Sequence, residues 1–345
     1  KATEANISTR ACATQNISPL RNIPSAPCPN GNPCRRSGPQ TACTSCLISK
    51  PAHSTCSMPI AVTERHGPTS TAAAPFSMLT TTKSGCALPL LHRVTHNGKT
   101  KFHLIHTWGW DHPALFHWES DDLIHWTAAN GGTRTDDGKI MLMDGHDGGP
   151  VSPNAWAPEF TYDGQTGTFY LYWSSRIGDR QVHHYCTTKD WFTFSTPAVY
   201  FDPGFTAIDM TILKEGDTYY AYYKDERNGE KTIRCATSKS LDPRVQRFEG
   251  STPLLPSRYI EVEGPEVFPA IGGKGWFLYF DKFNGDRGVS YTGCTDPSQH
   301  KWYPIPDDEI RNPTEVKHGS VEIISTAELE KLLEHLQSHL LKLKM

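Results

Sequence analysis

Thr168-Phe169-Tyr170-Leu171-Tyr172 is the stretch that decides the fold, because strands of the same kind recur along the chain. Each copy is a short run rich in aromatic and aliphatic residues, which is typical of a β-strand. The turn dipeptides Asn97-Gly98, Asp163-Gly164 and Glu215-Gly216 come shortly before three of the four copies. The other copies are residues 101–105, 218–222 and 275–279.

A second strand ending in a polar turn follows each copy, and helical periodicity is almost absent. A repeat of about 40 to 60 residues built from short strands is typical of a β-propeller blade. Four copies are visible, with room for one more. We therefore predict an all-β, five-bladed β-propeller whose first blade is incomplete. A β-sandwich with coincidentally similar strands is the alternative.

The first 85 residues differ in composition from the rest of the chain. They contain one of the 36 aromatic residues (9 Trp, 13 Tyr and 14 Phe in total), namely Phe76, and many Pro, Ser and Thr. Such a segment buries too little apolar surface to offset the entropy lost on folding. We predict that residues 1–85 are a low-complexity arm, either disordered or not native to the protein, and that residues 86–325 form the propeller.

The end of the chain predicts one helix. Ser325-Thr326-Ala327-Glu328 is a capping box, and leucines follow it at helical spacing. We expect residues 326–345 to form a short C-terminal helix that packs against the propeller. A partner-binding helix is the alternative.

Charge and hydropathy exclude several classes of protein. The formal net charge is -3, which gives no indication of a nucleic-acid partner. No stretch approaches the roughly 18 apolar residues of a membrane helix, so we expect no membrane partner. The chain begins with Lys1 and has no visible signal peptide.

Two acids interrupt apolar strand starts and are the first candidates for chemistry. Asp209 lies in Ala207-Ile208-Asp209-Met210, and Glu263 in Val262-Glu263-Gly264-Pro265. In a propeller the innermost strands surround a central funnel, so both carboxylates are expected to face the axis. Two carboxylates in one funnel suggest glycoside hydrolysis, and Trp156 and Trp108 could stack on sugar rings. Structural acids that cap strand starts are the alternative.

These motifs resemble glycoside hydrolase family 43. The resemblance covers about residues 86–340 and is strongest to the arabinofuranosidase-like branch, through Phe201-Asp202-Pro203-Gly204-Phe205 and Tyr223-Lys224-Asp225-Glu226-Arg227. The motifs that occur in family order are Trp156-Ala157-Pro158-Glu159, Ile208-Asp209, Glu263-Gly264-Pro265 and His318-Gly319-Ser320-Val321.

The resemblance implies an exo-glycosidase that removes terminal arabinofuranose or xylose from plant cell-wall polysaccharide with inversion. Glu263 would be the general acid, and Asp209 would modulate its pKa, because a like charge keeps an acid protonated. Trp156, Glu159, Trp108 and Phe205 are the expected substrate-binding residues. No cofactor is required, and the resemblance allows a structural Ca²⁺ near the axis, associated with His318 through water.

The expected general base is missing. In the family an Asp begins the first blade, whereas the matching stretch here, Gly85-Cys86-Ala87-Leu88-Pro89, has Leu88 at that position. Leucine cannot accept a proton from water, so the base is unassigned. Asp111, Asp144 or Asp147 could substitute, although none occupies a blade start.

Three functional interpretations follow. The first is an active, monomeric, extracellular glycosidase with a carbohydrate substrate. The second is a catalytically inactive carbohydrate-binding propeller, which Leu88 favours. The third is a protein-interaction propeller of the kelch type, which would have little use for paired acids in the funnel.

Overall fold

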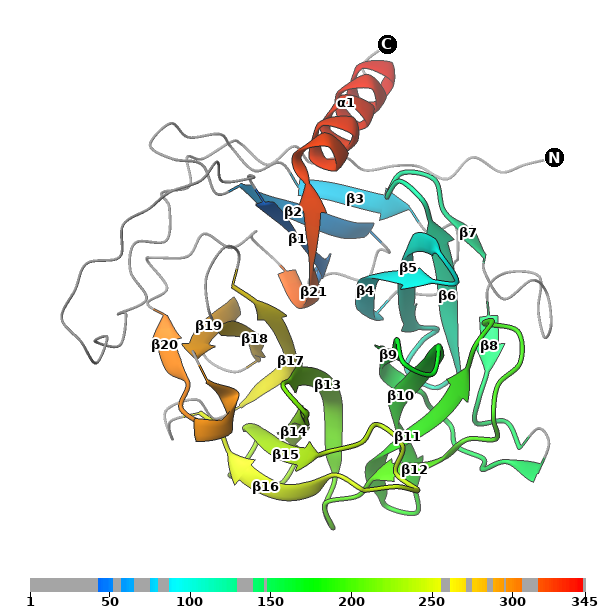
Figure 1. Cartoon of the computed structure of the whole chain (residues 1–345), viewed down its shortest axis with the longest axis vertical. Coiled ribbons are helices and arrows are strands. Elements are labelled where there is room, and N and C mark those ends of the chain that lie inside the picture. The colour runs from blue at the N-terminus through cyan, green and yellow to red at the C-terminus, as the bar shows by residue number, and fades with distance from the viewer. Residues whose placement is uncertain are drawn as a thin grey trace.

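The computed structural model describes residues 43–51, 57–64, 75–79, 87–128, 139–145, 148–255, 261–270, 275–283, 288–294, 296–305 and 316–343. Within these residues, antiparallel sheets form a ring around a central axis (Figure 1). The ring is an all-β propeller, as the sequence predicts, and it excludes the two-layer sandwich. No described helix is long and apolar enough to cross a membrane.

Four sheets are each built from consecutive strands and form blades of the propeller. The first contains β4 (Ala87–His96), β5 (Lys99–Thr107), β6 (Ala114–Ser120) and β7 (Thr127–Ala128), with β8 (Lys139–Met141) also paired to β6. The second contains β9 (Trp156–Asp163), β10 (Thr168–Ile177), β11 (Arg180–Thr188) and β12 (Ala198–Phe201). The third contains β13 (Ala207–Glu215), β14 (Thr218–Asp225), β15 (Ile233–Ser238) and β16 (Glu249–Pro253). The fourth contains β17 (Val262–Pro269), β18 (Trp276–Lys282), β19 (Gly288–Cys294) and β20 (Tyr303–Ile305), with a 3₁₀ helix, Pro297–Gln299, before β20.

The first blade has all four strands, so the expectation that it would be incomplete is wrong. Its last strand is only two residues long, which explains why the sequence pattern gives it no clear signal. The recurring stretches at residues 101–105, 168–172 and 218–222 fall in β5, β10 and β14, the second strand of each blade.

A further sheet joins the two ends of the described chain, in the order β21-β1-β2-β3. It combines β21 (Val316–Ser325) with β1 (Cys43–Pro51), β2 (Ser57–Glu64) and β3 (Pro75–Leu79). These three strands lie in the segment expected to be a disordered arm, and there the structure differs from that expectation. The backbone of β21 offers hydrogen-bonding groups that any chain can pair with, whatever its aromatic content. Residues 1–42 lie outside the described residues.

The hydrophobic core lies between blades rather than within one sheet. Leu90 and Ile105 of the first blade pack with Phe160, Phe169 and Trp173 of the second. The middle strands are therefore buried on both faces, and β10 is buried at eight consecutive positions. This explains why strands of this kind are continuously apolar instead of alternating.

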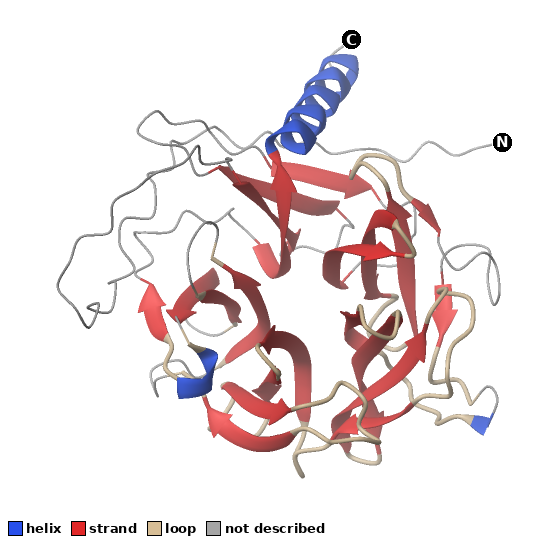
Figure 2. Cartoon of the chain, viewed as in Figure 1, coloured by secondary structure: helices blue, strands red, loops and turns tan. Residues whose placement is uncertain are grey.

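The predicted C-terminal helix is confirmed as α1 (Thr326–Leu343), which projects outwards from the ring (Figure 2). The capping box is formed: Glu328 accepts a hydrogen bond from Ser325 N at 2.7 Å, and Ser325 Oγ accepts one from Glu328 N at 3.3 Å. Leu329 and Leu332 are buried against the first blade and Ile324, so the first two turns of the helix pack against the propeller.

Candidate active site

The innermost strand of every sheet contains a register shift that marks a β-bulge. In three blades the shift lies between Ala87 and Leu90, between Ile208 and Thr211, and between Glu263 and Glu266. In β9 the shift lies between Trp156 and Glu159, which pair with Ser174 and Tyr172 of β10. In β21 it lies at His318, between Lys317 and Gly319. A bulge re-aims the side chains that it carries, so each strand can direct one segment to the axis.

Four bulge residues have left-handed backbone conformations, with φ of 45° at Ala157, 54° at Asp209, 56° at Gly264 and 41° at His318. Non-glycine residues adopt such values at a cost of about 1–3 kcal/mol, and they do so most often at functional sites. The bulges of the innermost strands, where these strained residues lie, are therefore the candidate site.

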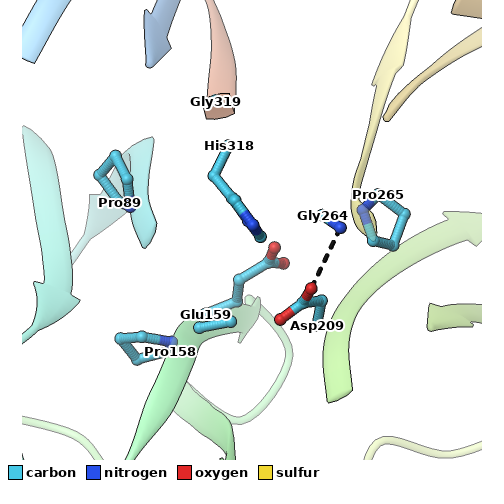
Figure 3. Close-up of a pocket in the computed structure, with 9 residues that line it drawn as sticks. Pro89, Pro158, Glu159, Asp209, Gly264, Pro265, His318 and Gly319 are labelled. Carbon is cyan, nitrogen blue, oxygen red and sulfur yellow. Dashed lines mark hydrogen bonds between the residues drawn. The ribbon is translucent and has the colours of Figure 1, made fainter. Parts of the chain in front are cut away.

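The bulges meet in one pocket that contains about 300 Å³ of empty space, part of it open to solvent. Figure 3 shows residues from separate strands pointing into it. The lining residues are Pro89, Ala157, Pro158, Glu159, Asp209, Gly264, Pro265, His318 and Gly319.

Asp209, Glu263 and His318 form a compact group at this level, with one side-chain oxygen or nitrogen atom of each within 4.8 Å of the others. Asp209 Oδ2 accepts a hydrogen bond from Gly264 N at 3.1 Å, which links the third and fourth blades. His318 Nε2 lies 3.7 Å from Glu263 Oε1. The buried carboxylate of Asp281 accepts a hydrogen bond from His318 N at 2.7 Å and fixes the strained backbone there.

Lys224 contacts the candidate site and is assigned no role from the sequence. Its side chain is buried, and Nζ lies 2.8 Å from Glu263 Oε2 and 2.5 Å from Glu226 Oε1. The Tyr223-Lys224-Asp225 motif contained the signal, because a lysine at the buried end of a strand requires anionic partners. Lys224 therefore fixes the position of the Glu263 carboxylate.

Electrostatics in this arrangement keep Glu263 ionised. Burial raises the pKa of Glu263, but the hydrogen bond and charge of His318 and the charge of Lys224 outweigh burial, so the pKa is lowered. The expectation that Asp209 keeps Glu263 protonated is not met, since two cations contact Glu263 directly. Burial raises the pKa of Asp209 itself, and the charge of Glu263 adds to this effect.

His318 is the cation that matches this anion. Burial lowers the pKa of His318, but its hydrogen bond to Glu263 and the charges of Asp209 and Asp281 outweigh burial and raise it. His318 and Glu263 thus form an ion pair in which the imidazole of His318 carries the proton and the Glu263 carboxylate is ionised.

The Ca²⁺ expected near the axis and associated with His318 through water stays a prediction, and the residues here do not fit an ion bound directly to His318. Calcium takes six to eight oxygen ligands, whereas Nε2 of His318 is a nitrogen that faces Glu263 at 3.7 Å and Asp281 at 3.8 Å, and Lys224 already pairs with Glu263.

A second group of possible metal ligands, His103, His117 and Glu119, lies away from the pocket. The two imidazoles are nearly coplanar, with an interplanar angle of 5°, and His103 Nδ1 is 3.0 Å from His117 Nε2. This is the geometry of a hydrogen bond between the rings, which leaves no space for an ion between the two nitrogens.

The structure brings Glu263, Asp209, His318 and Glu159 together, but the predicted aromatic residues do not line the pocket. Trp156 donates from Nε1 to the carbonyl oxygen of Trp110 at 2.6 Å, beside the pocket. Trp108 stacks on His112, and Phe205 packs on the guanidinium of Arg227, 3.9 Å from the ring centroid.

The first blade contributes Pro89 to the pocket, the residue directly after Leu88, which stands at the predicted position of the base. Leu88 lies in β4 at the bulge, and its side chain is outside the described residues. Asp111 and Asp144, considered as substitute bases, do not line the pocket, and Asp147 lies outside the described residues.

Comparison with known families identifies the domain. Residues 98–330 match a family-43-related model described as a probable glycosyl hydrolase domain. The chain belongs to this glycosyl hydrolase family. It is also 28% identical over 185 residues to an alpha-L-arabinofuranosidase of Bifidobacterium longum subsp. longum, a match that covers 44% of this chain and 16% of that protein.

Two solved structures are also similar to this family member. The xyloglucan PUL GH43B protein of Bacteroides ovatus has 18% identity and a TM-score of 0.48, over 66% of this chain and 41% of that one. The catalytic domain of the Coprinopsis cinerea GH62 alpha-L-arabinofuranosidase has 14% identity and a TM-score of 0.47, over 70% and 73% of the two chains. The chain thus spans less than half the length of the Bifidobacterium and Bacteroides proteins.

Proposed function

We propose that this chain is an exo-acting glycosidase that removes terminal arabinofuranose, or xylose, from plant cell-wall polysaccharide with inversion. The observation that supports it best is the pocket at the propeller axis, which gathers Asp209, His318 and Glu159 beside Glu263. The Bifidobacterium relative is an arabinofuranosidase, which favours arabinose as the sugar. The proposed protein acts as a monomer outside the cell, where its polymeric substrate is found, and requires no cofactor.

Glu263 is the proposed general acid, and His318 is the proposed source of its proton. The two side chains are 3.7 Å apart and share one proton, which rests on His318 in this arrangement. A bound sugar excludes water, and exclusion of water disfavours separated charges relative to a neutral pair. The proton then moves to Glu263, which passes it to the oxygen of the leaving group.

Asp209 and Lys224 are proposed to position this acid from opposite sides. Asp209 holds the Gly264 backbone directly after Glu263, and Lys224 contacts the carboxylate itself. The sheet β21-β1-β2-β3 is the proposed fifth blade, because its innermost strand contributes His318 as the other blades contribute their own bulge residues.

The test is hydrolysis of aryl arabinofuranosides, xylosides and galactosides by the purified chain. We expect turnover of a pentoside and loss of turnover in Glu263→Gln, with the anomer of the first-formed sugar read by NMR. A folded wild-type chain without turnover on any of these substrates would refute the proposal.

The second candidate is a carbohydrate-binding propeller without catalysis, which Pro89 and Leu88 favour because neither side chain can accept a proton. It predicts that calorimetry detects binding of arabinoxylan oligosaccharides while no sugar is released. Leu88→Asp, which restores the family residue, should then create activity.

A further inference from the structure

An inverting glycosidase needs a proton acceptor for the attacking water on the side of the sugar opposite the acid. The bulge of β4 supplies Leu88 and Pro89 at the position of the usual base, and neither can accept a proton. Hydrolysis by this chain therefore requires an acceptor elsewhere in the pocket.

Two of the described residues that line the pocket have carboxylates, Asp209 and Glu159. Asp209 lies within 4.8 Å of Glu263, and its Oδ2 is engaged by Gly264 N. Acid and base in inverting enzymes are about 6.5–9.5 Å apart, to leave room for water. Asp209 is thus too close to the acid to be the base.

Glu159 is the other carboxylate of the pocket, and it is not one of the three residues, Asp209, Glu263 and His318, whose side-chain atoms all lie within 4.8 Å of one another. It follows the bulge of β9, and Figure 3 shows its side chain extending from this strand into the space between His318 and Asp209. Tyr172 donates its hydroxyl to Glu159 Oε2 at 3.3 Å, and the Thr211 side chain also hydrogen-bonds the carboxylate. Two neighbouring strands therefore hold the carboxylate in place.

Its surroundings also raise the basicity of the Glu159 carboxylate, and with it the pH at which the carboxyl ionises. Burial raises the pKa of Glu159, and the charges of Glu266 and Asp209 raise it further, against the opposing hydrogen bonds of Thr211 and Tyr172. A carboxylate with a higher pKa takes a proton from water more readily once it is ionised.

We propose that Glu159 is the general base of this chain and replaces the missing acid of the first blade. This inference rests on the proposed function. A lone pair of water forms a bond to the anomeric carbon while Glu159 takes one proton of that water. The glycosidic C–O bond breaks, its electrons go to the leaving oxygen, and that oxygen takes the proton of Glu263. One water molecule is consumed.

Glu159→Gln and Glu263→Gln can be distinguished by their dependence on the leaving group. A dinitrophenyl leaving group needs no acid, so Glu263→Gln should lose far less activity on it than on a methylumbelliferyl pentoside. Glu159→Gln should lose about 10² to 10⁴-fold in kcat/KM on both substrates, because water still needs a base. The matched control is Glu249→Gln, at an exposed position in β16, which should keep wild-type activity.

Glu159→Ala provides a second readout. Added azide should restore turnover and yield a glycosyl azide, since this anion attacks without a base, and a merely structural role would give no such product. The inference is overturned if the kcat/KM of Glu159→Gln stays within about threefold of wild type. It is also overturned if Glu159→Gln, like Glu263→Gln, loses far less activity on the dinitrophenyl substrate than on the methylumbelliferyl one. If the wild-type chain is inactive on both substrates, the proposed function fails and the inference fails with it.

Discussion

Five buried histidines make this propeller sensitive to acid. They are His103, His106, His117, His183 and His184, each less than 5% exposed. Burial lowers the pKa of His103 and His183 to about 3 and that of His106 and His184 to about 4, and it lowers the pKa of His117 well below its ordinary value. All five are therefore neutral in the folded protein at neutral pH.

Local contacts explain the neutrality of His106. Its Nε2 must accept the hydrogen bond from Trp118 Nε1 at 3.1 Å, because an indole nitrogen can only donate. Its Nδ1 then donates to the carbonyl oxygen of Thr107 at 3.0 Å. A second proton on this ring would break the bond to Trp118.

The expected loss of stability follows from the difference between folded and unfolded pKa values. A histidine whose pKa is lowered by folding binds its proton more readily when unfolded, so its contribution is complete above pH 6.5 and declines as the pH falls towards the folded value. From pH 6.5 to 5 each loses about 2 kcal/mol, at about 1.4 kcal/mol per pH unit. Five independent groups would lose about 10 kcal/mol.

Two effects reduce this total. His103 and His117 share a hydrogen bond and do not titrate independently. Burial raises the pKa of Glu266 to about 7 and also raises the pKa of Glu159 and Asp209. These carboxyls bind protons more readily in the folded state, and Glu266 alone returns about 2 kcal/mol between pH 7 and 5. The net loss is therefore smaller than about 10 kcal/mol, and even about 4 kcal/mol is a large part of the whole stability of many domains.

Urea denaturation at pH 7, 6 and 5 measures this loss directly. In His106→Gln, the difference in the free energy of unfolding between pH 7 and pH 5 should be about 2 kcal/mol smaller than in wild type. A wild-type free energy of unfolding at pH 5 within about 2 kcal/mol of its value at pH 7 would refute the reasoning.

Three more predictions concern single side chains. A methyl group added by Gly264→Ala would lie 2.5 Å from Nδ1 of His318, at a backbone φ of 56°; we expect activity to fall at least tenfold, and unchanged kcat/KM would contradict this. Ser325→Ala removes the cap of α1 and should lower the free energy of unfolding by about 1 kcal/mol, whereas Ser325→Asp should retain most of it. Lys224→Met removes a cation beside Glu263 and should raise the pKa of that carboxyl, so the alkaline limb of kcat/KM should move to higher pH; an unmoved limb would show that Lys224 does not act on the acid.

Local patterns predicted the elements of the fold well. The strand at residues 168–172 and the capping box at residues 325–328 depend on near neighbours in sequence, and both form as expected. The position of Asp209 and Glu263 at strand starts also sufficed to bring them together, because the propeller directs every innermost strand to one axis.

Features that depend on contacts between distant strands could not be predicted from the sequence. The burial of Lys224 depends on carboxylates from another blade, and the exclusion of Phe205 from the pocket depends on its packing against Arg227. A bulge shifts the direction of side chains by one residue, and the sequence contains no local signal for it at Trp156 or Pro89.

The position of His318 has a consequence for biosynthesis. This side chain enters the pocket on β21, the last strand of the described chain to leave the ribosome, whereas Glu159 and Asp209 are on strands made much earlier. The blades β9–β12 and β13–β16 can form on the nascent chain, but the pocket stays open on one side until β21 pairs with β1. The pocket should therefore be complete only after β21 has been synthesised and the two ends of the ring have met.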